Sequence, residues 1–402
     1  AKPDRERRDV RGRELMASID KRPDGRFRAR WREYPGGPQK SQHFARKSDA
    51  QAFIDELAGA QRAGTYVDPK AGWLTFAEWW EQWRPGRHDL NASSAERDDG
   101  YYRARILEAI GPVPLARIDR SMLRAWVQDM VAAGLAATTV RHTFGLVRQA
   151  LDAAVEDRLI GANPAIRFRG LPKIVAPEMR IATPEDMTTL ASRIAEGWAT
   201  WVLTAGYTGL RLGELSALRR GRVDLAGRRI QVLESVTEVN GQNVFGAPKT
   251  KAGRRSVPVP EPIAVLVEQQ CHGLDRDDLV FTAPRGGVIR RSKIRQQIWL
   301  PATVAAGLGT ITKTEDPKTG KTSTHYEGLR IHDLRHTAVS FWISEGANIK
   351  QLTTWAGHSS AATLIDRYGH LFPDNETGVM NNLADTIRTA RARPVATVTK
   401  IA

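Results

Sequence analysis

Arginine and apolar residues alternate strictly in the stretch RFRARWREY, which follows the turn signal Pro23-Asp24-Gly25. The arginines Arg26, Arg28, Arg30 and Arg32 share one parity, and Phe27, Ala29 and Trp31 share the other. Because successive side chains of a strand point to opposite faces, the pattern predicts a β-strand with an arginine face and an apolar face. We expect residues 41–46 to form its partner strand and residues 48–64 to form an amphipathic helix. Four arginines with no intervening acid on that face favour contact with DNA over an ordinary solvated surface.

Apolar residues recur at helical spacing from residue 73 to residue 165. Thr75 and Glu78 form a capping-box pattern, and Phe76, Trp79, Trp80 and Trp83 follow on one face. Further helices are predicted at 95–110, 119–134 and 136–160, the last with Val140, Phe144, Val147 and Leu151 along one side. The pattern therefore predicts an all-helical domain followed by a basic, proline-bearing linker.

From residue 179 the pattern becomes mixed α/β. Helices are predicted at 183–196, 330–346, 348–358 and 360–372, and a helix, glycine turn and helix at 198–225. Residues 228–235 and 242–250 read as strands around the hairpin signal Asn240-Gly241, and residues 254–260 as a third short strand. The polar stretch 310–328 has no clear periodicity and is predicted to be an exposed loop. The expected fold is multidomain, with a sheet-plus-helix domain, an all-helical domain and a mainly helical α+β domain carrying a small β-hairpin sheet.

Composition narrows the class of partner. The 402 residues include 60 lysines and arginines against 45 aspartates and glutamates, a formal net charge of +15 and a pI of about 10.2. A chain of about 400 residues is expected to form two or three domains. A large positive net charge predicts a polyanionic partner, usually nucleic acid. The single cysteine, Cys271, fits a reducing cytoplasm, and no apolar run has the length of a membrane span. The first ~14 residues are highly charged and are predicted to be disordered.

Two chemistries compete for the histidine-rich stretch RIHDLRH. His332 and His336 lie at i,i+4, the spacing of two zinc ligands, and His370 or His358 could add a third. A phosphodiester site explains more of the sequence. Such a site needs cations that hold the non-bridging oxygens, a proton donor for the leaving 5′-oxygen, and a nucleophile. Arginine can supply the cations, lysine or histidine can supply the proton, and tyrosine can be the nucleophile.

The ordered motifs of the second half resemble those of the tyrosine recombinases, the phage-integrase family. YTGLRLGEL is similar to the first arginine box, PKTKAGRRSVPV to the lysine hairpin, HDLRHT to the second box, AGHSS to the Gly-His motif and IDRYGHLF to the nucleophile segment. The resemblance implies the catalytic residues Arg211, Lys249, His332, Arg335, His358 and Tyr368, with Glu214 orienting arginine. Lys251 is a nearby competitor of Lys249, whereas His370 is left out of the site.

The resemblance implies roles for these residues. Tyr368 attacks the scissile phosphate and forms a 3′-phosphotyrosyl link, Arg211 and Arg335 clamp the phosphate, and Lys249 protonates the leaving oxygen. His332 acts as acid or base and His358 hydrogen-bonds the phosphate. Such chemistry conserves the phosphodiester energy, so no cofactor and no metal are expected.

The resemblance is strong over residues 179–372 and weaker before them. It implies an arm-type DNA-binding domain at 1–64, a core-binding domain at 73–165 and a catalytic domain with a C-terminal tail at 179–402. The implied partners are double-stranded DNA at core and arm attachment sites and three further copies of the chain, a tetramer that exchanges strands through a Holliday junction. An accessory directionality factor and a DNA-bending protein are compatible with this assembly. The implied setting is the cytoplasm of a bacterial host, at the nucleoid, where a phage or mobile element integrates and excises.

Two alternatives stay open. A DNA-binding regulator could keep the recombinase fold without activity, and its expected signature is a missing box residue, although none is missing here. A zinc hydrolase could use His332 and His336.

The spacing of His358 and Tyr368 adds a structural expectation. Ten residues on one continuous helix would turn the two side chains roughly 80° apart, so we expect a break near Ser359-Ser360.

Overall fold

The computed structural model describes residues 16–32, 38–62, 71–88, 90–175, 178–248, 250–315, 320, 322–374 and 376–392. The chain divides into two compact units, residues 1–176 and residues 177–402. The predicted disorder of the first ~14 residues lies outside the described residues. The division of the first unit into an arm-binding and a core-binding domain stays a prediction.

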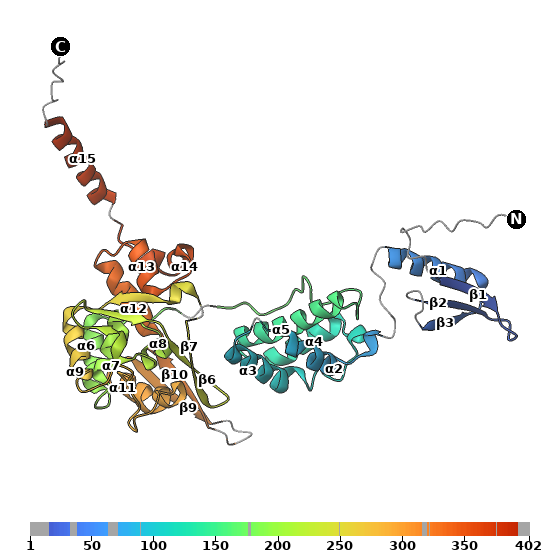
Figure 1. Ribbon diagram of the computed structural model, residues 1–402, viewed down its shortest axis with the longest axis horizontal. Coiled ribbons are helices and arrows are strands. Elements are labelled where there is room, and N and C mark those ends of the chain that lie inside the picture. The colour runs from blue at the N-terminus through green and yellow to red at the C-terminus, as the bar shows by residue number, and fades with distance from the viewer. Residues whose placement is uncertain are drawn as a thin grey trace, which may run out of the picture. The chain divides into compact units, whose positions relative to one another are not determined.

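The first unit begins with a three-stranded antiparallel sheet covered on one face by a helix (Figure 1). The elements are β1 (Met16–Lys21), β2 (Phe27–Arg32), β3 (Gln39–Phe44) and α1 (Lys47–Arg62). The predicted apolar parity of β2 is confirmed, since Ala29 and Trp31 are buried and the Trp31 ring lies 5.2 Å from that of Phe53 on α1. Strand β1 was not predicted, and its register places Asp20 directly opposite Arg28.

The remainder of the first unit is helical, as predicted. It contains α2 (Phe76–Trp83), α3 (Ala92–Tyr101), a π-helical turn (Tyr102–Ile106), α4 (Arg120–Ala132) and α5 (Ala137–Glu156). The capping box of Thr75 and Glu78 is present at the start of α2. The predicted core positions of α2 and α5 are buried, among them Phe76, Trp80 and Val147, except that Trp83 is only partly buried. Sequence periodicity was sufficient here because each helix buries one apolar stripe against its neighbours.

The second unit is mainly helical (Figure 1). Its helices are α6 (Pro184–Arg193), α7 (Ala199–Thr208), α8 (Leu212–Ser216), α9 (Glu261–Gln270), α10 (Arg291–Lys293), α11 (Leu300–Ala305), α12 (Asp333–Ser344), α13 (Ile349–Ala356), α14 (Ala361–Tyr368) and α15 (Glu376–Ala392), with a π-helical turn at Ile294–Trp299. One large core is built around α7, where Trp201 and Val202 are almost completely buried. None of the helices in the described ranges is both long and apolar enough to cross a membrane.

Three small antiparallel sheets lie among the described strands of the second unit. They are formed by β4 (Val223–Asp224), β5 (Arg229–Val232) and β8 (Arg255–Pro258); by β6 (Ser235–Val239) and β7 (Gln242–Gly246); and by β9 (Gly309–Glu315) and β10 (Thr322–Gly328). The Asn240-Gly241 hairpin is confirmed, but the partner of β7 is β6. The predicted strand 228–235 is two strands, of which β5 pairs with β8.

The predicted exposed loop at 310–328 is wrong, because the stretch forms the β9–β10 hairpin. Its strands carry no hydrophobic alternation because they project from the unit, and even Ile311 remains 39% exposed. The base of the hairpin is fixed by Tyr326, whose hydroxyl donates to the Leu329 carbonyl at 2.7 Å. A strand pair without a buried face lacks the period-two signal on which the prediction depended.

Candidate active site

The predicted break between His358 and Tyr368 is confirmed, and it lies at the end of α13. Helix α13 stops at Ala356, and Gly357 follows in the left-handed conformation at φ +62°. Ser360 then caps α14, accepting a hydrogen bond from the Thr363 N–H. A Cβ at position 357 would lie 2.8 Å from the Ala252 carbonyl oxygen, so glycine is required both by the conformation and by the close approach.

Three arginines distant in the sequence converge on the carboxyl end of α13. The carbonyl oxygens of residues 355, 356 and 357 accept hydrogen bonds from Arg255 (2.7 Å), Arg335 and Arg211 (3.4 Å), respectively. The last carbonyls of a helix have no intrahelical partners and carry the negative end of the helix dipole. The end of α13 is therefore a suitable platform for guanidinium groups, and it assembles side chains from α8, β8 and α12.

Glu214 joins two of these arginines. Its carboxylate accepts from both terminal nitrogens of Arg255, at 3.0 and 2.8 Å, and from Arg211 at 2.8 Å. Burial alone would raise the pKa of Glu214, but the hydrogen bonds and charge of Arg255, followed by those of Arg211, lower it to about 2. Arg255 was not among the predicted site residues. Nothing in the sequence marks it as a site residue, because it is one of two adjacent arginines at the start of a short strand.

Arg335 is the most deeply placed of the predicted cations. It is 3% exposed, and its guanidinium also donates to the Gly209 carbonyl at 2.8 Å, which ties α12 to the turn before Arg211. Burial, followed by the neighbouring Arg211 charge, lowers its pKa to about 9. Glu214 pairs directly with Arg211 and Arg255, whereas Arg335 donates to backbone carbonyls. The cluster therefore has three guanidinium groups for one carboxylate, an excess of positive charge that an anion would neutralise.

The predicted histidines lie next to this cluster. His332 is exposed at the start of α12, and burial of part of its ring lowers its pKa, as does the Arg335 charge. His358 follows Gly357 directly, and burial, then Arg335, lowers its pKa to about 4. The Nε2 atom of His358 is buried and has no hydrogen-bond partner among the described residues. A neutral imidazole with an unused nitrogen is suited to hydrogen-bond a ligand oxygen.

Tyr368 ends α14 and is completely buried. Its hydroxyl lies 2.6 Å from Nδ1 of His336, the residue after Arg335 on α12. Burial raises the pKa of Tyr368, while the charges of Arg335 and Arg367 act in the opposite direction. Sequence reasoning considered His336 only as a zinc ligand, because nothing local indicates a contact between residues 32 positions apart.

Not all predicted site residues can be placed. Lys249 lies outside the described residues, and so does the side chain of its competitor Lys251. The strand that follows, β8, carries Arg255 into the cluster described above. The structure therefore brings together Arg211, Glu214 and Arg335 with the end of α13 that leads to His358, and it leaves the lysine assignment as a prediction.

The arginines of the first unit form a separate group. Arg28 and Arg30 lie on the polar face of β2, and both pair with Asp20 of β1, at 2.8 and 3.0 Å. The expectation of a face without acids is therefore wrong, because the unpredicted strand β1 contributes one. Arg26 lies before β2 and is exposed, while Arg32 ends the strand. Two guanidinium groups side by side are still able to contact phosphates, and Asp20 fixes their positions.

The zinc interpretation is not favoured by the contacts. Asp333, which stands where a zinc protease helix has its acid, is fully buried and binds the Arg330 guanidinium and backbone N–H. His336 is engaged by Tyr368. Within the described ranges, no three histidine, cysteine or acidic side chains are grouped as metal ligands would be.

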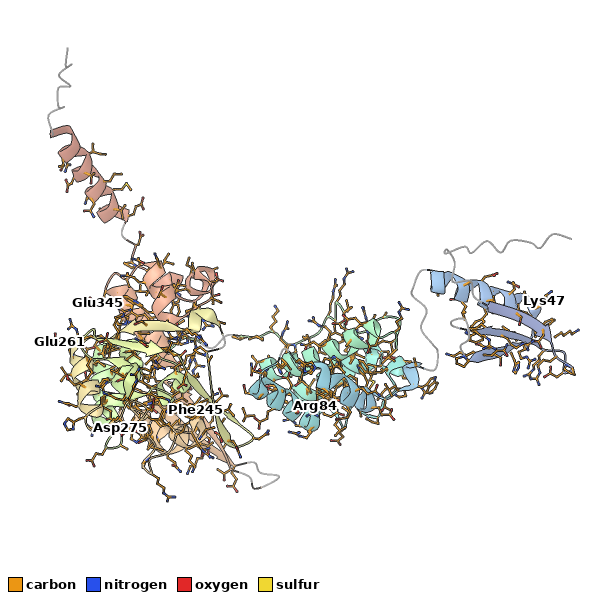
Figure 2. All side chains as sticks on the ribbon, in the orientation of Figure 1. Lys47, Arg84, Phe245, Glu261, Asp275 and Glu345 are labelled. Carbon is orange, nitrogen blue, oxygen red and sulfur yellow. The ribbon has the colours of Figure 1, made fainter. Side chains whose placement is uncertain are left out.

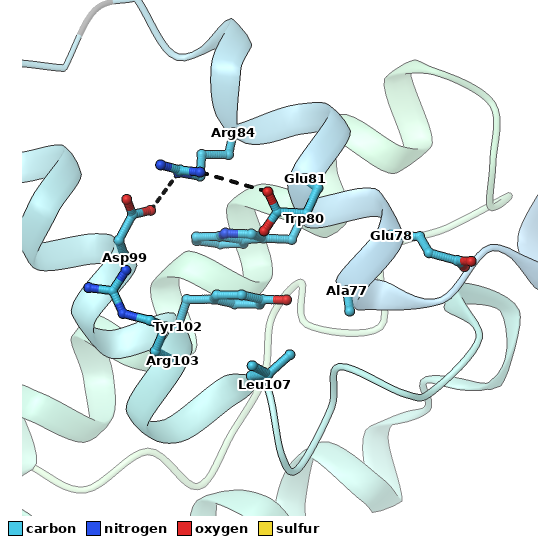
Figure 3. Close-up of a pocket in the computed structure, with 9 residues that line it drawn as sticks. All are labelled: Ala77, Glu78, Trp80, Glu81, Arg84, Asp99, Tyr102, Arg103 and Leu107. Atoms are coloured by element: carbon cyan, nitrogen blue, oxygen red, sulfur yellow. Dashed lines mark ion pairs between the residues drawn. The ribbon is translucent and has the colours of Figure 1, made fainter.

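A separate pocket lies in the helical part of the first unit (Figure 3). It has a volume of about 450 Å³ and a floor formed by Trp80 stacked on Tyr102, with ring centres 4.4 Å apart. Arg84, also labelled in Figure 2, pairs with Asp99 at 2.7 Å and with Glu81 at 3.7 Å beside it. Arg84 is therefore occupied by acids, and the pocket lining lacks the array of cations seen around α13.

The chain is similar in sequence and in fold to known integrases. A family model described as the phage integrase family matches residues 185–374. The integrase of Mycobacterium phage L5 is 27% identical over 333 residues, which cover 79% of this chain and 83% of that protein. A segment of the Tn1549 transposon integrase in complex with circular intermediate DNA has a TM-score of 0.61 at 18% identity, covering 77% of this chain and 99% of that chain. A lambda integrase tetramer bound to a Holliday junction has a TM-score of 0.51 at 15% identity, covering 92% and 97%.

Proposed function

Since the chain belongs to the phage integrase family, the tyrosine recombinases, we propose that Tyr368 is the nucleophile with which it cuts DNA. The protein is a site-specific DNA recombinase, an integrase, that cleaves and rejoins DNA strands through a covalent tyrosine intermediate. The neighbouring cations are the groups that bind the scissile phosphate. The regulator and zinc hydrolase alternatives are not favoured.

The observation that carries the assignment of residues is the guanidinium cluster at the end of α13. Arg211 and Arg335 both donate to carbonyls there, and Arg211 keeps a side chain that is 40% exposed and can reach a DNA phosphate. The excess positive charge of the cluster supports binding of an anion with two non-bridging oxygens. The unpartnered Nε2 of His358 supports an additional hydrogen bond to that anion.

The proposed reaction combines these positions with the roles that the family resemblance implies for Lys249 and His332. The phenolic oxygen of Tyr368 attacks phosphorus, its proton leaves, and the bond from phosphorus to the 5′-oxygen breaks. The leaving 5′-oxygen takes a proton from Lys249, and the DNA 3′ end remains joined to Tyr368 as a phosphodiester. His332 is the acid or base that handles the phenolic proton. Because the tyrosine link preserves the energy of the broken bond, the reverse attack by a 5′-hydroxyl rejoins the strand.

The remaining parts of the chain bind DNA around this site. The proposal assigns the sheet with Arg26, Arg28, Arg30 and Arg32 to arm sites and the helices of residues 73–165 to core sites. A tetramer on a Holliday junction, the state named for the lambda integrase structure, is the proposed recombining assembly. The net charge of +15 supports this reading, because neutralisation of phosphates provides most of the affinity of proteins for DNA.

A nicked suicide substrate tests the nucleophile. Cleavage beside the nick releases a short oligonucleotide, so the covalent protein–DNA adduct accumulates. We expect an adduct with the wild-type chain and none with Tyr368→Phe, while Tyr207→Phe, on α7, serves as the control tyrosine and retains it. An adduct that persists in Tyr368→Phe would show that another residue attacks.

A further inference from the structure

We propose that His336 is a positioning residue that holds Tyr368 in a docked position in the DNA-free protein and must release it before cleavage. The proposal rests on the proposed function, in which Tyr368 is the nucleophile. It starts from a conflict between two observations: the nucleophile must meet a DNA phosphate, yet its side chain is 0% exposed. Among the described residues, the side chain that hydrogen-bonds this hydroxyl is His336, whose Nδ1 lies 2.6 Å away.

The contact is built from two rigid positions. His336 lies one residue after Arg335 on α12, and its own ring is 7% exposed. The Tyr368 ring centre is 5.6 Å from that of His336, which is in turn 5.3 Å from that of His332 in an edge-to-face arrangement. The phenol is therefore fixed both by its hydroxyl and by ring packing against α12.

The contact is suited to holding the phenol and not to removing its proton. Burial, followed by the nearby His332 ring, lowers the pKa of His336 to about 4, so the imidazole is neutral and can accept the phenolic hydrogen at Nδ1. Burial also raises the pKa of Tyr368 above its ordinary value of 10. Both shifts act against transfer of the proton from the phenol to the imidazole. In this state the tyrosine is a neutral, hydrogen-bonded phenol.

Besides this hydrogen bond, α14 is held by one small apolar cluster, in which its buried residues pack with residues of α12 and α13 such as Val339 and Leu352. It is eight residues long, and its buried residues are Leu364 and Tyr368, while Ile365 remains 47% exposed. A break at residues 357–360 separates it from α13. Local opening of such an element requires few contacts to be lost, so one hydrogen bond on Tyr368 makes a large contribution to the docked population.

Hydrogen exchange of the full-length, DNA-free protein tests directly whether His336 keeps Tyr368 and α14 docked. His336→Phe keeps an aromatic ring but removes the acceptor, and we expect the amides of α14 to exchange about 2- to 12-fold faster, the range that corresponds to the net contribution of one hydrogen bond. His336→Asn can place its amide oxygen where Nδ1 lies and should restore the wild-type rate. Tyr368→Phe should match His336→Phe, and the double variant should show no further increase. His272→Phe, an exposed position after α9, is the matched control and should change nothing in α14.

Cleavage of the suicide substrate gives the second readout. With His336→Phe, the adduct should form at the wild-type rate or faster, because the docked position precedes the reaction. A slower rate that His336→Asn restores would overturn the proposal, since it would place His336 in the reacting complex. Unchanged exchange in α14, or faster exchange throughout residues 178–392, would also overturn it. Failure of the proposed function looks different: Tyr368→Phe would then still form an adduct, whatever happens at position 336.

Discussion

Removing Arg255 should destabilise the second unit strongly, because this arginine neutralises a buried carboxylate. The Arg255 and Glu214 side chains are only 2% and 3% exposed and meet at 2.8 Å. The pKa of Glu214 is about 2 instead of 4.5, a difference that corresponds to about 3 kcal/mol. Because the folded-state value is the lower one, this stabilisation is present above pH 4.5 and is lost as the pH falls toward 2.

The perturbation is Arg255→Met, which keeps a long apolar stem and leaves Glu214 with Arg211 alone. Breaking a buried pair by removing one partner costs about 3–5 kcal/mol, so we expect a loss of this size at pH 7. The loss should shrink at acid pH, because Glu214 of the variant can take up a proton. A double-mutant cycle with Glu214→Gln should give a coupling of about 3 kcal/mol, because Arg255 lowers the Glu214 pKa more than Arg211 does.

The assay is native-state hydrogen exchange of the full chain, read on peptides from β8 and α13. A single global unfolding transition would not be informative, because the chain has two units. The matched control is the exposed pair of Arg219 and Glu234, which meet at 3.1 Å with side chains 31% and 40% exposed. Its cycle should give less than about 1 kcal/mol. Equal coupling energies for the two pairs would refute the reasoning that burial of Glu214 makes Arg255 indispensable.

Three further predictions concern other parts of the molecule. Gly357→Ala should destabilise the second unit by about 1–2 kcal/mol or more and reduce adduct formation at least tenfold, whereas Gly273→Ala, also at positive φ but in open space, should leave adduct formation intact. Since the folded pKa of His336 is about 4 against an ordinary 6.5, the opening free energy of α12 should fall by up to about 1.4 kcal/mol per pH unit as the pH falls from 6.5 to 4, and a native-state hydrogen-exchange free energy that stays constant over this range would contradict this. Arg28→Ala should weaken arm-site binding and flatten its salt dependence, while Asp20→Asn should strengthen it; a change in core-site binding alone would exclude the arm assignment.

The sequence predicted the parts of the site that depend on local patterns. The break between His358 and Tyr368 followed from the 100° turn per helical residue, and the structure has it at Gly357 to Ser360. Motif order also indicated Arg211 and Arg335, which the structure brings to one helix end.

The sequence could not predict contacts that depend on tertiary structure. Arg255 reaches Glu214 across 41 residues, and His336 reaches Tyr368 across 32, with no local signal for either contact. The β9–β10 hairpin was missed because neither strand buries a regular face, so its residues show no alternation. Asp20 was overlooked for a related reason, since it lies on a strand that only the register of the sheet places beside Arg28.

The central claim is that Tyr368 becomes joined to the 3′ end of cleaved DNA. Proteolysis of the trapped adduct followed by mass spectrometry of the nucleotide-linked peptide tests it most directly. The account predicts one modified peptide, containing residues 361–367 and the phosphorylated Tyr368, and DNA that keeps a 5′ label on the strand upstream of the cleavage site. A nucleotide linked to any other residue, or a link through the 5′ phosphate of the downstream fragment, would contradict it.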